Sequence, residues 1–313
     1  MSFLENGSKS NKSMENFRCG FVALIGRPNV GKSTLLNTII GQKISIVSNK
    51  VQTTRRQLIG VLTEENHQAI FVDTPGVHKP LTQLGKILNE TAQRALADVD
   101  VILVVVDSST PPGKDDTAIA KMIESAIGPS EKMVLLCLNK MDLLKAENVV
   151  AHVEGYCKLF KTEQYMFTSF TKNQNIDKLK DLIFHTLPEG DPIFPKDTLT
   201  DLPMRILAAE IVREKALHLT KKEVPYGIAT LVDLWEEEPD SKLTRIELSI
   251  VVERESQKGI LIGKQGSMLK AIGTAARLEI ESLIGHKVFL KLFVKVREDW
   301  RQNLRYLSDF GYL

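Results

Sequence analysis

Short apolar runs alternate with amphipathic stretches through the first 187 residues of the chain. Residues 21–25 (FVALI) have the pattern of a buried strand, and residues 34–40 follow with helical spacing that ends at Gly41. This alternation favours an α/β fold with a doubly wound, mostly parallel sheet, in which ligands bind at the carboxyl ends of the strands. The further strands are predicted at 57–62, 68–72, 100–106, 133–138 and 165–170, and the further helices at 81–97, 115–126 and 176–186.

A second pattern begins after a proline-rich break. Residues 188–203 (PEGDPIFPKDTLTDLP) contain four prolines and no periodicity, which indicates a linker between domains. The first 17 residues are polar and lack the apolar core of a signal peptide, so we expect a disordered tail there. The predicted division is a tail at 1–17, a nucleotide-binding domain at 18–187, the linker at 188–203 and a second domain at 204–313.

Beyond the linker, the order of elements is helix, strand, strand, helix, helix, strand. A helix is expected over 202–219, and two long strands alternate over 225–237 and 242–253 around an acidic turn. A helix ending near residue 284 and a strand over 287–296 complete this half.

The composition is typical of a soluble globular protein. It has 313 residues, of which 43% are hydrophobic and 26% are charged, and a net charge of +2. Its three cysteines are far apart and have no metal-ligand spacing, which favours reduced thiols in the cytoplasm. No run of about 18 apolar residues is present, so no membrane span is expected.

The first chemical motif is a phosphate loop. Gly26-Arg27-Pro28-Asn29-Val30-Gly31-Lys32-Ser33 matches G-x-x-x-x-G-K-[ST] between a predicted strand and a predicted helix, the context that this motif requires. The glycines let backbone N–H groups and the helix N-terminus hold nucleotide phosphates. Lys32 would reach the β and γ phosphates, and the Ser33 hydroxyl would bind Mg²⁺. The residues expected at the nucleotide here are Gly26, Arg27, Pro28, Asn29, Val30, Gly31, Lys32, Ser33 and Thr34.

Two further motifs face the γ phosphate in this interpretation. The pair Thr53-Thr54 lies where a switch threonine senses that phosphate through Mg²⁺. The strand at 68–72 ends in Asp73-Thr74-Pro75-Gly76, so that Asp73 can face the Mg²⁺ and Gly76 can bring its backbone N–H to the γ phosphate. Alone, D-T-P-G would be a turn signal. The nearby His78 is more typical of an exposed loop residue than of a catalytic base.

The motif Asn139-Lys140-Met141-Asp142 selects the base. The Asp142 carboxylate can accept from both N1–H and the 2-amino group of guanine, a donor pair that adenine lacks. Asn139 would face the opposite edge of the base and tie down the phosphate loop, and Lys140 would lie along the base plane. This motif disfavours an ATP-using RNA enzyme such as a helicase or kinase.

Together, GRPNVGKS, the threonine pair, DTPG and NKMD resemble the translation-factor class of P-loop GTPases, and the Q-T-T-R switch is similar to that of the Era family. The resemblance implies a GTPase that uses GTP/GDP and Mg²⁺. It implies that Ser33, Thr54 and, through water, Asp73 hold the metal, with Thr54 favoured over Thr53. It also places Ser169-Phe170 where a serine-alanine pair usually completes the guanine pocket.

One position departs from Ras-like GTPases, in which a glutamine after the DxxG glycine orients the attacking water. Here that position is Val77, whose side chain cannot hydrogen-bond water, so we expect slow intrinsic hydrolysis that a partner or a cation raises. Relatives with a hydrophobic residue here and an asparagine at the position of Asn29 can use K⁺. We therefore add Asn29, with K⁺, to Thr54, Asp73 and Gly76 as the catalytic candidates.

The second half contains Gly263-Lys264-Gln265-Gly266 between two predicted helices. With the α-β-β-α-α-β order, this loop resembles that of a KH domain of the bacterial type II kind, an α+β fold. Such a domain seats about four single-stranded nucleotides, which the resemblance assigns to Ile260, Ile262, Gly263, Lys264, Gln265 and Gly266. Residues 258–313 carry ten basic and five acidic side chains, which attracts phosphate without identifying a sequence.

A GTPase domain followed by a KH domain is the architecture of the Era family. The resemblance implies a GTP-driven switch that binds the 3′ end region of 16S-type rRNA and acts in assembly of the small (30S) ribosomal subunit. It further implies a monomer in the cytoplasm with peripheral contact to the inner face of the cell membrane. The alternative is a regulatory GTPase whose second domain binds a protein partner or another RNA.

Overall fold

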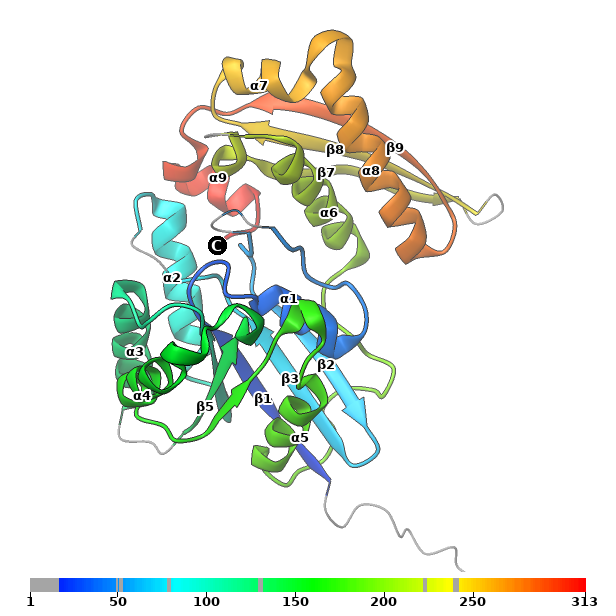
Figure 1. The fold of residues 1–313 in the computed structure, drawn as a ribbon. Helices are drawn as coiled ribbons and strands as arrows, with labels where there is room; N and C mark the ends of the chain where they lie inside the picture. The colour runs from blue at the N-terminus through cyan, green and yellow to red at the C-terminus, as the bar shows by residue number, and fades with distance from the viewer. Residues whose placement is uncertain are drawn as a thin grey trace, which may run out of the picture.

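The structure is a computed structural model that describes residues 17–48, 50, 53–77, 80–128, 132–221, 224–238 and 242–313. The predicted tail therefore lies outside the described residues except for Phe17, and so does His78. Figure 1 shows two sheets, one in the lower half with the first helices and one in the upper half with the last helices.

The lower half contains a six-stranded sheet in the order β2-β3-β1-β4-β5-β6. Only the pair β2 and β3 is antiparallel within this sheet, which confirms the predicted doubly wound, mostly parallel fold. Its strands are β1 (Arg18–Ile25), β2 (Leu58–Glu64), β3 (His67–Asp73), β4 (Val101–Asp107), β5 (Met133–Asn139) and β6 (Tyr165–Phe167).

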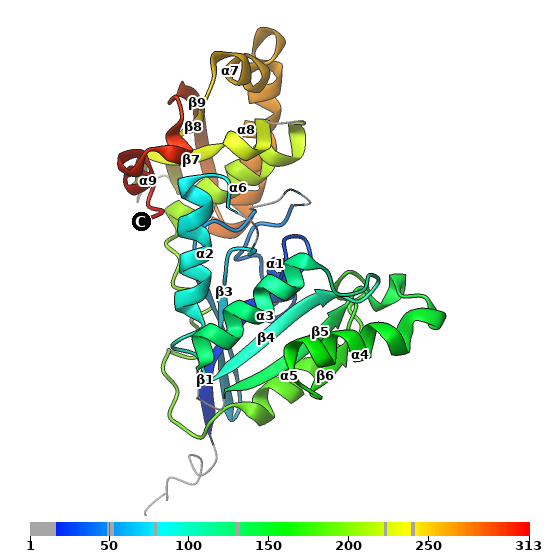
Figure 2. The same ribbon diagram turned by 90° about the vertical axis from the view of Figure 1, so that its left-hand side faces the viewer.

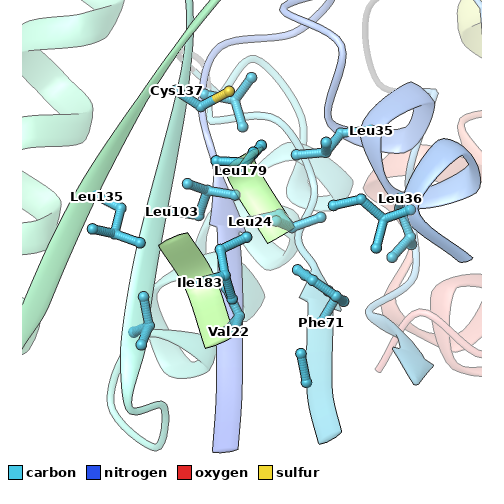
Figure 3. Close-up of a cluster of buried hydrophobic side chains, with 14 of the residues drawn as sticks. Val22, Leu24, Leu35, Leu36, Phe71, Leu103, Leu135, Cys137, Leu179 and Ile183 are labelled. Carbon is cyan, nitrogen blue, oxygen red and sulfur yellow. The ribbon is translucent and has the colours of Figure 1, made fainter. Parts of the chain in front are cut away.

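Helices cover both faces of this sheet. Figure 3 shows the core on one face, where Leu24 and Phe71 from the strands meet Leu36 from α1 and Ile183 from α5. Helices α2, α3 and α4 bury the opposite face. The sequence analysis did not predict α4, whose buried side includes the polar ring of His152 and so breaks the apolar pattern. The helices are α1 (Lys32–Ile40), α2 (Gln83–Ala95), α3 (Lys114–Ile127), α4 (Val149–Phe160) and α5 (Ile176–Thr186).

The upper half has the predicted α-β-β-α-α-β order around a three-stranded sheet, β7-β8-β9. β7 is antiparallel to β8, whereas β9 is parallel to it. The strand predicted from residue 225 begins only at Ala229, because Val224–Gly227 forms a 3-10 turn around Pro225, which lacks an N–H for a sheet. The elements are α6 (Met204–Leu219), β7 (Ala229–Glu238), β8 (Leu243–Val252), α7 (Glu255–Ile262), α8 (Ser267–Ile284), β9 (Lys287–Val296) and α9 (Leu304–Asp309).

The segment between the halves, 188–203, has no helix or strand of its own but is fixed to the first sheet. The Gln68 Oε1 accepts from the N–H groups of Ile193 and Phe194 at 2.8 and 2.9 Å, respectively. The Val61 N–H donates to the Leu199 carbonyl at 2.9 Å. These bonds hold the predicted linker along β2 and β3.

The two halves share a small core that the sequence did not predict. Leu84 and Leu88 of α2 pack against Trp300 and Phe310 near the C-terminus, and Figure 2 shows α2 reaching up to α9. The buried Arg55 guanidinium donates to the carbonyls of Ile228 at 2.6 Å and Tyr226 at 3.0 Å. Segments on both sides of the Asp73 motif therefore contact the upper half.

Candidate nucleotide and RNA sites

The phosphate loop joins β1 to α1 and requires its two glycines. A Cβ added to Gly26 would overlap the Val105 carbonyl oxygen. Gly31 has φ 109°, and a Cβ there would lie 2.7 Å from Asn139 Nδ2. Because α1 begins at the next residue, its N-terminal N–H groups lie at the end of this loop, an arrangement that binds anions.

Lys32 is the buried cation of this loop. Its side chain is 6% exposed, and its Nζ donates to the carbonyls of Gly26 at 2.9 Å and Arg27 at 3.1 Å. Burial lowers the pKa of Lys32 to about 8, and the charge of Asp73 opposes this shift. A phosphate group at the loop would supply the negative charge that favours protonated Lys32.

Three hydroxyl groups surround one carboxylate oxygen beside the loop. The Ser33 and Thr54 hydroxyls lie 2.9 Å apart, and those of Ser33, Ser45 and Thr54 donate to Asp73 Oδ2 at 3.1, 3.2 and 3.4 Å. Burial raises the pKa of Asp73, opposed by Lys32 and by these hydrogen bonds. The Asp73 Oδ1 is also buried, with no hydrogen-bond partner among the described residues.

This oxygen set fits Mg²⁺, which prefers hard oxygen ligands and keeps several waters. Ser33, Thr54 and Asp73 are the three residues that the family resemblance assigns to the metal. Ser45 is an addition that no motif marked, since it lies in an ordinary apolar-polar alternation, Ile44-Ser45-Ile46.

The structure separates the two switch threonines. The Thr53 hydroxyl donates to the Lys50 carbonyl at 2.7 Å, whereas the Thr54 hydroxyl faces Ser33 and Asp73. Thr54 is therefore the member of the pair that is positioned to reach a metal.

The DTPG segment lies against the phosphate loop. A Cβ on Gly76 would come within 3.1 Å of the Pro28 backbone, and the Thr74 hydroxyl donates to the Leu24 carbonyl at 2.7 Å. Pro75 is also buried. Val77 is 3% exposed and packs in the core beneath, so its side chain does not enter the pocket that Gly76 and Asn29 line.

Asn139 connects the base motif to the rest of the site. Its Nδ2 donates to the Val30 carbonyl at 2.7 Å, and its Oδ1 accepts from the Phe170 N–H at 3.2 Å. Lys140 has φ 62° and pairs with Asp107 at 2.7 Å. Met141 and the exposed Asp142 lie in the 3-10 turn Met141–Leu143 just beyond the end of β5.

The Ser169-Phe170 pair has a large side chain where related pockets have a small one, and that side chain is buried in the core. The Phe170 ring is 5% exposed and packs in the core, close to Gly31. Ser169 is fully buried, and its backbone pairs with that of Gln174. The large side chain therefore points into the protein, and only the Phe170 backbone remains beside Asn139.

The G-x-x-G loop has the conformation that its glycines permit. Gly263 has φ 72° and ψ 178°, and Gly266 has φ 78° and ψ 9°. Ile260 is 49% exposed, Ile262 is half-buried, and both Lys264 and Gln265 are exposed. The loop therefore offers an exposed cation beside apolar side chains, at a turn where a nucleic-acid backbone can approach closely.

The Lys32 pKa leads to a pH prediction. As the pH rises above 8, a growing fraction of the free protein lacks the Lys32 proton, and nucleotide binding to that fraction takes one up. We therefore expect affinity for GDP to fall by up to about tenfold per pH unit above 8. Calorimetry in buffers of different ionisation enthalpy should detect proton uptake at pH 8.5 that Lys32→Arg lacks. Equal proton counts for both proteins at pH 8.5 would contradict the assignment.

The fold and these sites define a P-loop GTPase joined to a KH domain. A family model for "50S ribosome-binding GTPase" matches residues 21–140, and one for "KH domain" matches residues 223–301. The chain belongs to the Era family of GTPases. It is 46% identical to GTPase Era of Heliobacterium modesticaldum over 299 residues, which are 96% of this chain and 98% of that protein. It is 45% identical to GTPase Era of Geobacter metallireducens over 296 residues, covering 95% and 98%.

Solved structures agree over the same length. A crystal structure of Era in complex with MgGDPNP and nucleotides 1506–1542 of 16S ribosomal RNA matches with a TM-score of 0.89 and 42% identity. A crystal structure of a single-residue variant of Aquifex aeolicus Era bound to GDP·AlF4⁻ matches with a TM-score of 0.89 and 41% identity. Each match covers 95% of this chain and 99% of the solved one.

Proposed function

We propose that this protein is a GTP-hydrolysing switch that binds the 3′ end region of 16S-type rRNA through its KH domain, in assembly of the small ribosomal subunit. One observation carries the proposal. The segment that brings Thr54 to Ser33 and Asp73 also contacts α6 and the turn before β7. Within it, Lys43 Nζ lies 2.6 Å from Glu214 Oε2, and the Val47 N–H donates to Glu214 Oε1 at 2.8 Å. Loss of the γ phosphate would therefore displace a segment that is bound directly to Glu214 of α6 in the RNA-binding half.

We propose one role for each of the predicted domains. Residues 18–187 bind GTP or GDP with Mg²⁺, 188–203 connect, and 204–313 bind RNA. We propose that Lys32 contacts the phosphates, that Ser33, Thr54 and Asp73 hold Mg²⁺, and that Asn139 and Asp142 recognise guanine. Mg²⁺ supplies charge neutralisation at the β and γ phosphates when bound. Binding of the 16S rRNA segment by a relative with 42% identity over nearly its whole length supports the RNA assignment.

Hydrolysis is expected to be slow and to depend on K⁺. Val77 is buried, so it offers no group to orient water, and Asn29 is exposed on the phosphate loop with φ 65°. We expect turnover of GTP in K⁺ buffer to exceed that in Na⁺ buffer at least several-fold, and Asn29→Ala to remove the difference. Release of phosphate under single-turnover conditions is the measurement. Equal rates in the two buffers would exclude the cation role.

We propose a cytoplasmic monomer with peripheral contact to the inner face of the cell membrane. No helix in the described part of the chain is long and apolar enough to cross a bilayer.

The competing function is a GTPase whose second domain binds a protein or another RNA. Fluorescence anisotropy with an oligonucleotide from the 3′ end of 16S-type rRNA, compared with one of the same composition in scrambled order, separates these two functions. Tighter binding of the native sequence supports the proposal. Equal binding of both sequences, or of neither, would favour the alternative.

A further inference from the structure

The face of the KH sheet opposite α6 and α8 carries an alternating pattern of cations and aromatic rings along β9, and Trp300, Leu307 and Phe310 cover another part of the same face at Ala229 and Val251. On β9, every second residue points to this face, and the five are Lys287, Phe289, Lys291, Phe293 and Lys295, with no acid among them. The intervening residues, such as Leu290 and Leu292, pack in the core below α6 and α8. Figure 2 shows α7 and α8 on the other side of the sheet from this face. We call these five residues the β9 ladder.

The ladder is exposed where RNA could reach it. Phe289 is 51% exposed, and the side chains of Lys287 and Lys291 are 80% and 50% exposed. The Arg245 guanidinium of β8 lies 5.9 Å from the centre of the Phe289 ring, and the Lys291 Nζ lies 4.8 Å from that of Phe293. Two rings and the cations beside them thus share one accessible strand, an arrangement on which bases can stack.

The lysines and the acids of this face lie on different strands. The acidic neighbours lie on β8 and β7, where Glu247 pairs with Lys291 at 3.3 Å and Asp233 pairs with Lys295 at 3.0 Å. Glu236 of β7 lies opposite Arg245. Lys287 is 3.7 Å from Glu281 of α8. The lysines of this face therefore gather along β9, at the edge of the sheet, but each of the three is paired with an acid of a neighbouring element, so RNA phosphates would compete with these ion pairs.

The same strand adjoins the G-x-x-G element. β9 is an edge strand of the sheet, and α7, which leads into Gly263, packs against it. A strand of RNA leaving the loop region can therefore pass over the β9 edge onto the ladder without crossing another element.

We propose that the β9 ladder is a second RNA-contact surface that continues the G-x-x-G groove, with unpaired bases stacking on Phe289 and Phe293 and phosphates contacting the lysines. Rings alternating with cations on an open sheet are the arrangement by which proteins hold single strands with little sequence preference. The inference rests on the proposed RNA-binding function and extends its length. The G-x-x-G groove selects about four nucleotides, and the ladder holds the nucleotides that follow.

RNA is favoured over an acidic protein or a lipid surface by the alternation itself. A bilayer surface needs clustered cations, whereas a stacking platform needs rings spaced along a path, and these two rings are about 13 Å apart along one strand. Continuity with the loop that the KH assignment already gives to RNA points the same way.

The test uses two oligonucleotides from the 3′ end of 16S-type rRNA, one of about five nucleotides and one of about fourteen. The variant is Lys287→Ala/Phe289→Ala in the full chain, and the matched control is Lys121→Ala/Tyr165→Ala, which removes one exposed lysine and one exposed ring from the other domain. Loss of one base stack and one phosphate contact should weaken binding of the long oligonucleotide about tenfold or more. Binding of the short one should be unchanged, and Phe289→Trp should bind the long one like the unaltered protein.

Unchanged binding of the long oligonucleotide by Lys287→Ala/Phe289→Ala would overturn the inference while leaving the KH function intact. Equal weakening for both lengths would also overturn it, because the residues would then act within the G-x-x-G groove. Loss of binding to anionic vesicles with RNA binding retained would show a membrane surface instead. If the unaltered protein binds neither oligonucleotide, the proposed RNA function fails and the ladder inference fails with it.

Discussion

Asp142→Asn is expected to lower the affinity for GDP by about a hundredfold or more while leaving the thermal stability of the nucleotide-free protein unchanged. The amide NH2 group of asparagine would face the guanine N1–H or 2-amino group, so that two donors meet. A donor left without an acceptor in the complex costs about 1–3 kcal/mol. Asp142 is exposed in the 3-10 turn Met141–Leu143, so exchanging its carboxylate for an amide should affect nucleotide binding rather than folding. Binding of fluorescent GDP is the measurement.

The matched control is Asp115→Asn, an exposed carboxylate at the start of α3 that lies outside the proposed site. It should bind GDP like the unaltered protein. Undiminished GDP binding by Asp142→Asn, or tight binding of ADP by the unaltered protein, would contradict the guanine assignment.

Gly263→Asp is expected to reduce affinity for the 16S-type 3′-end oligonucleotide by at least about a hundredfold and to leave GDP binding unchanged. A Cβ at Gly263 would lie 2.8 Å from that of Met268, and φ 72° is unfavourable for aspartate, so the loop must rearrange. The added carboxylate also repels the phosphate that approaches this turn. Anisotropy with the labelled oligonucleotide measures the loss.

Two further variants separate RNA contact from misfolding. Lys264→Glu changes an exposed side chain and should still weaken RNA binding about tenfold. Gly190→Asp adds the same single negative charge as Gly263→Asp, but in open space on the linker, and should leave RNA binding unchanged. If Gly263→Asp and Lys264→Glu both bind the oligonucleotide normally, the proposed RNA contact at the G-x-x-G loop is wrong.

The class of fold was predictable because its elements are either apolar runs or strongly periodic helices. β4 is buried along nearly its whole length and reads as a continuous run, VILVVV, whatever surrounds it. α4 was missed because a helix that buries His152 and contains Gly155 lacks a clear apolar stripe. β7 began four residues later than predicted because strand-like alternation does not show where a 3-10 turn at Pro225 gives way to a ladder.

The places of Lys32 and Asp142 in the fold, at the phosphate loop and just beyond the end of β5, were predictable because each motif fixes both residue type and spacing. Ser45 was not, because a serine between two isoleucines is also what an ordinary half-buried strand contains. The contacts of Arg55 with the upper half were not predictable either, since its partners are backbone carbonyls more than 170 residues away and carry no sequence signal. The orientation of Phe170 depended on where Gly31 lies, which only the fold determines.

Our central claim is that the bound nucleotide controls the affinity for RNA through the segment between Lys43 and Arg55. In the present arrangement Thr54 meets Ser33 and Asp73 while Ile260 and Lys264 are exposed, so the switch position proposed for Mg²⁺ binding and an accessible RNA loop coexist. The most direct measurement is the affinity for the 16S-type 3′-end oligonucleotide of one preparation loaded with a non-hydrolysable GTP analogue and then with GDP. We expect binding at least about tenfold tighter with the GTP analogue, and a difference that Thr54→Ala removes. Equal affinity in the two nucleotide states would contradict the claim.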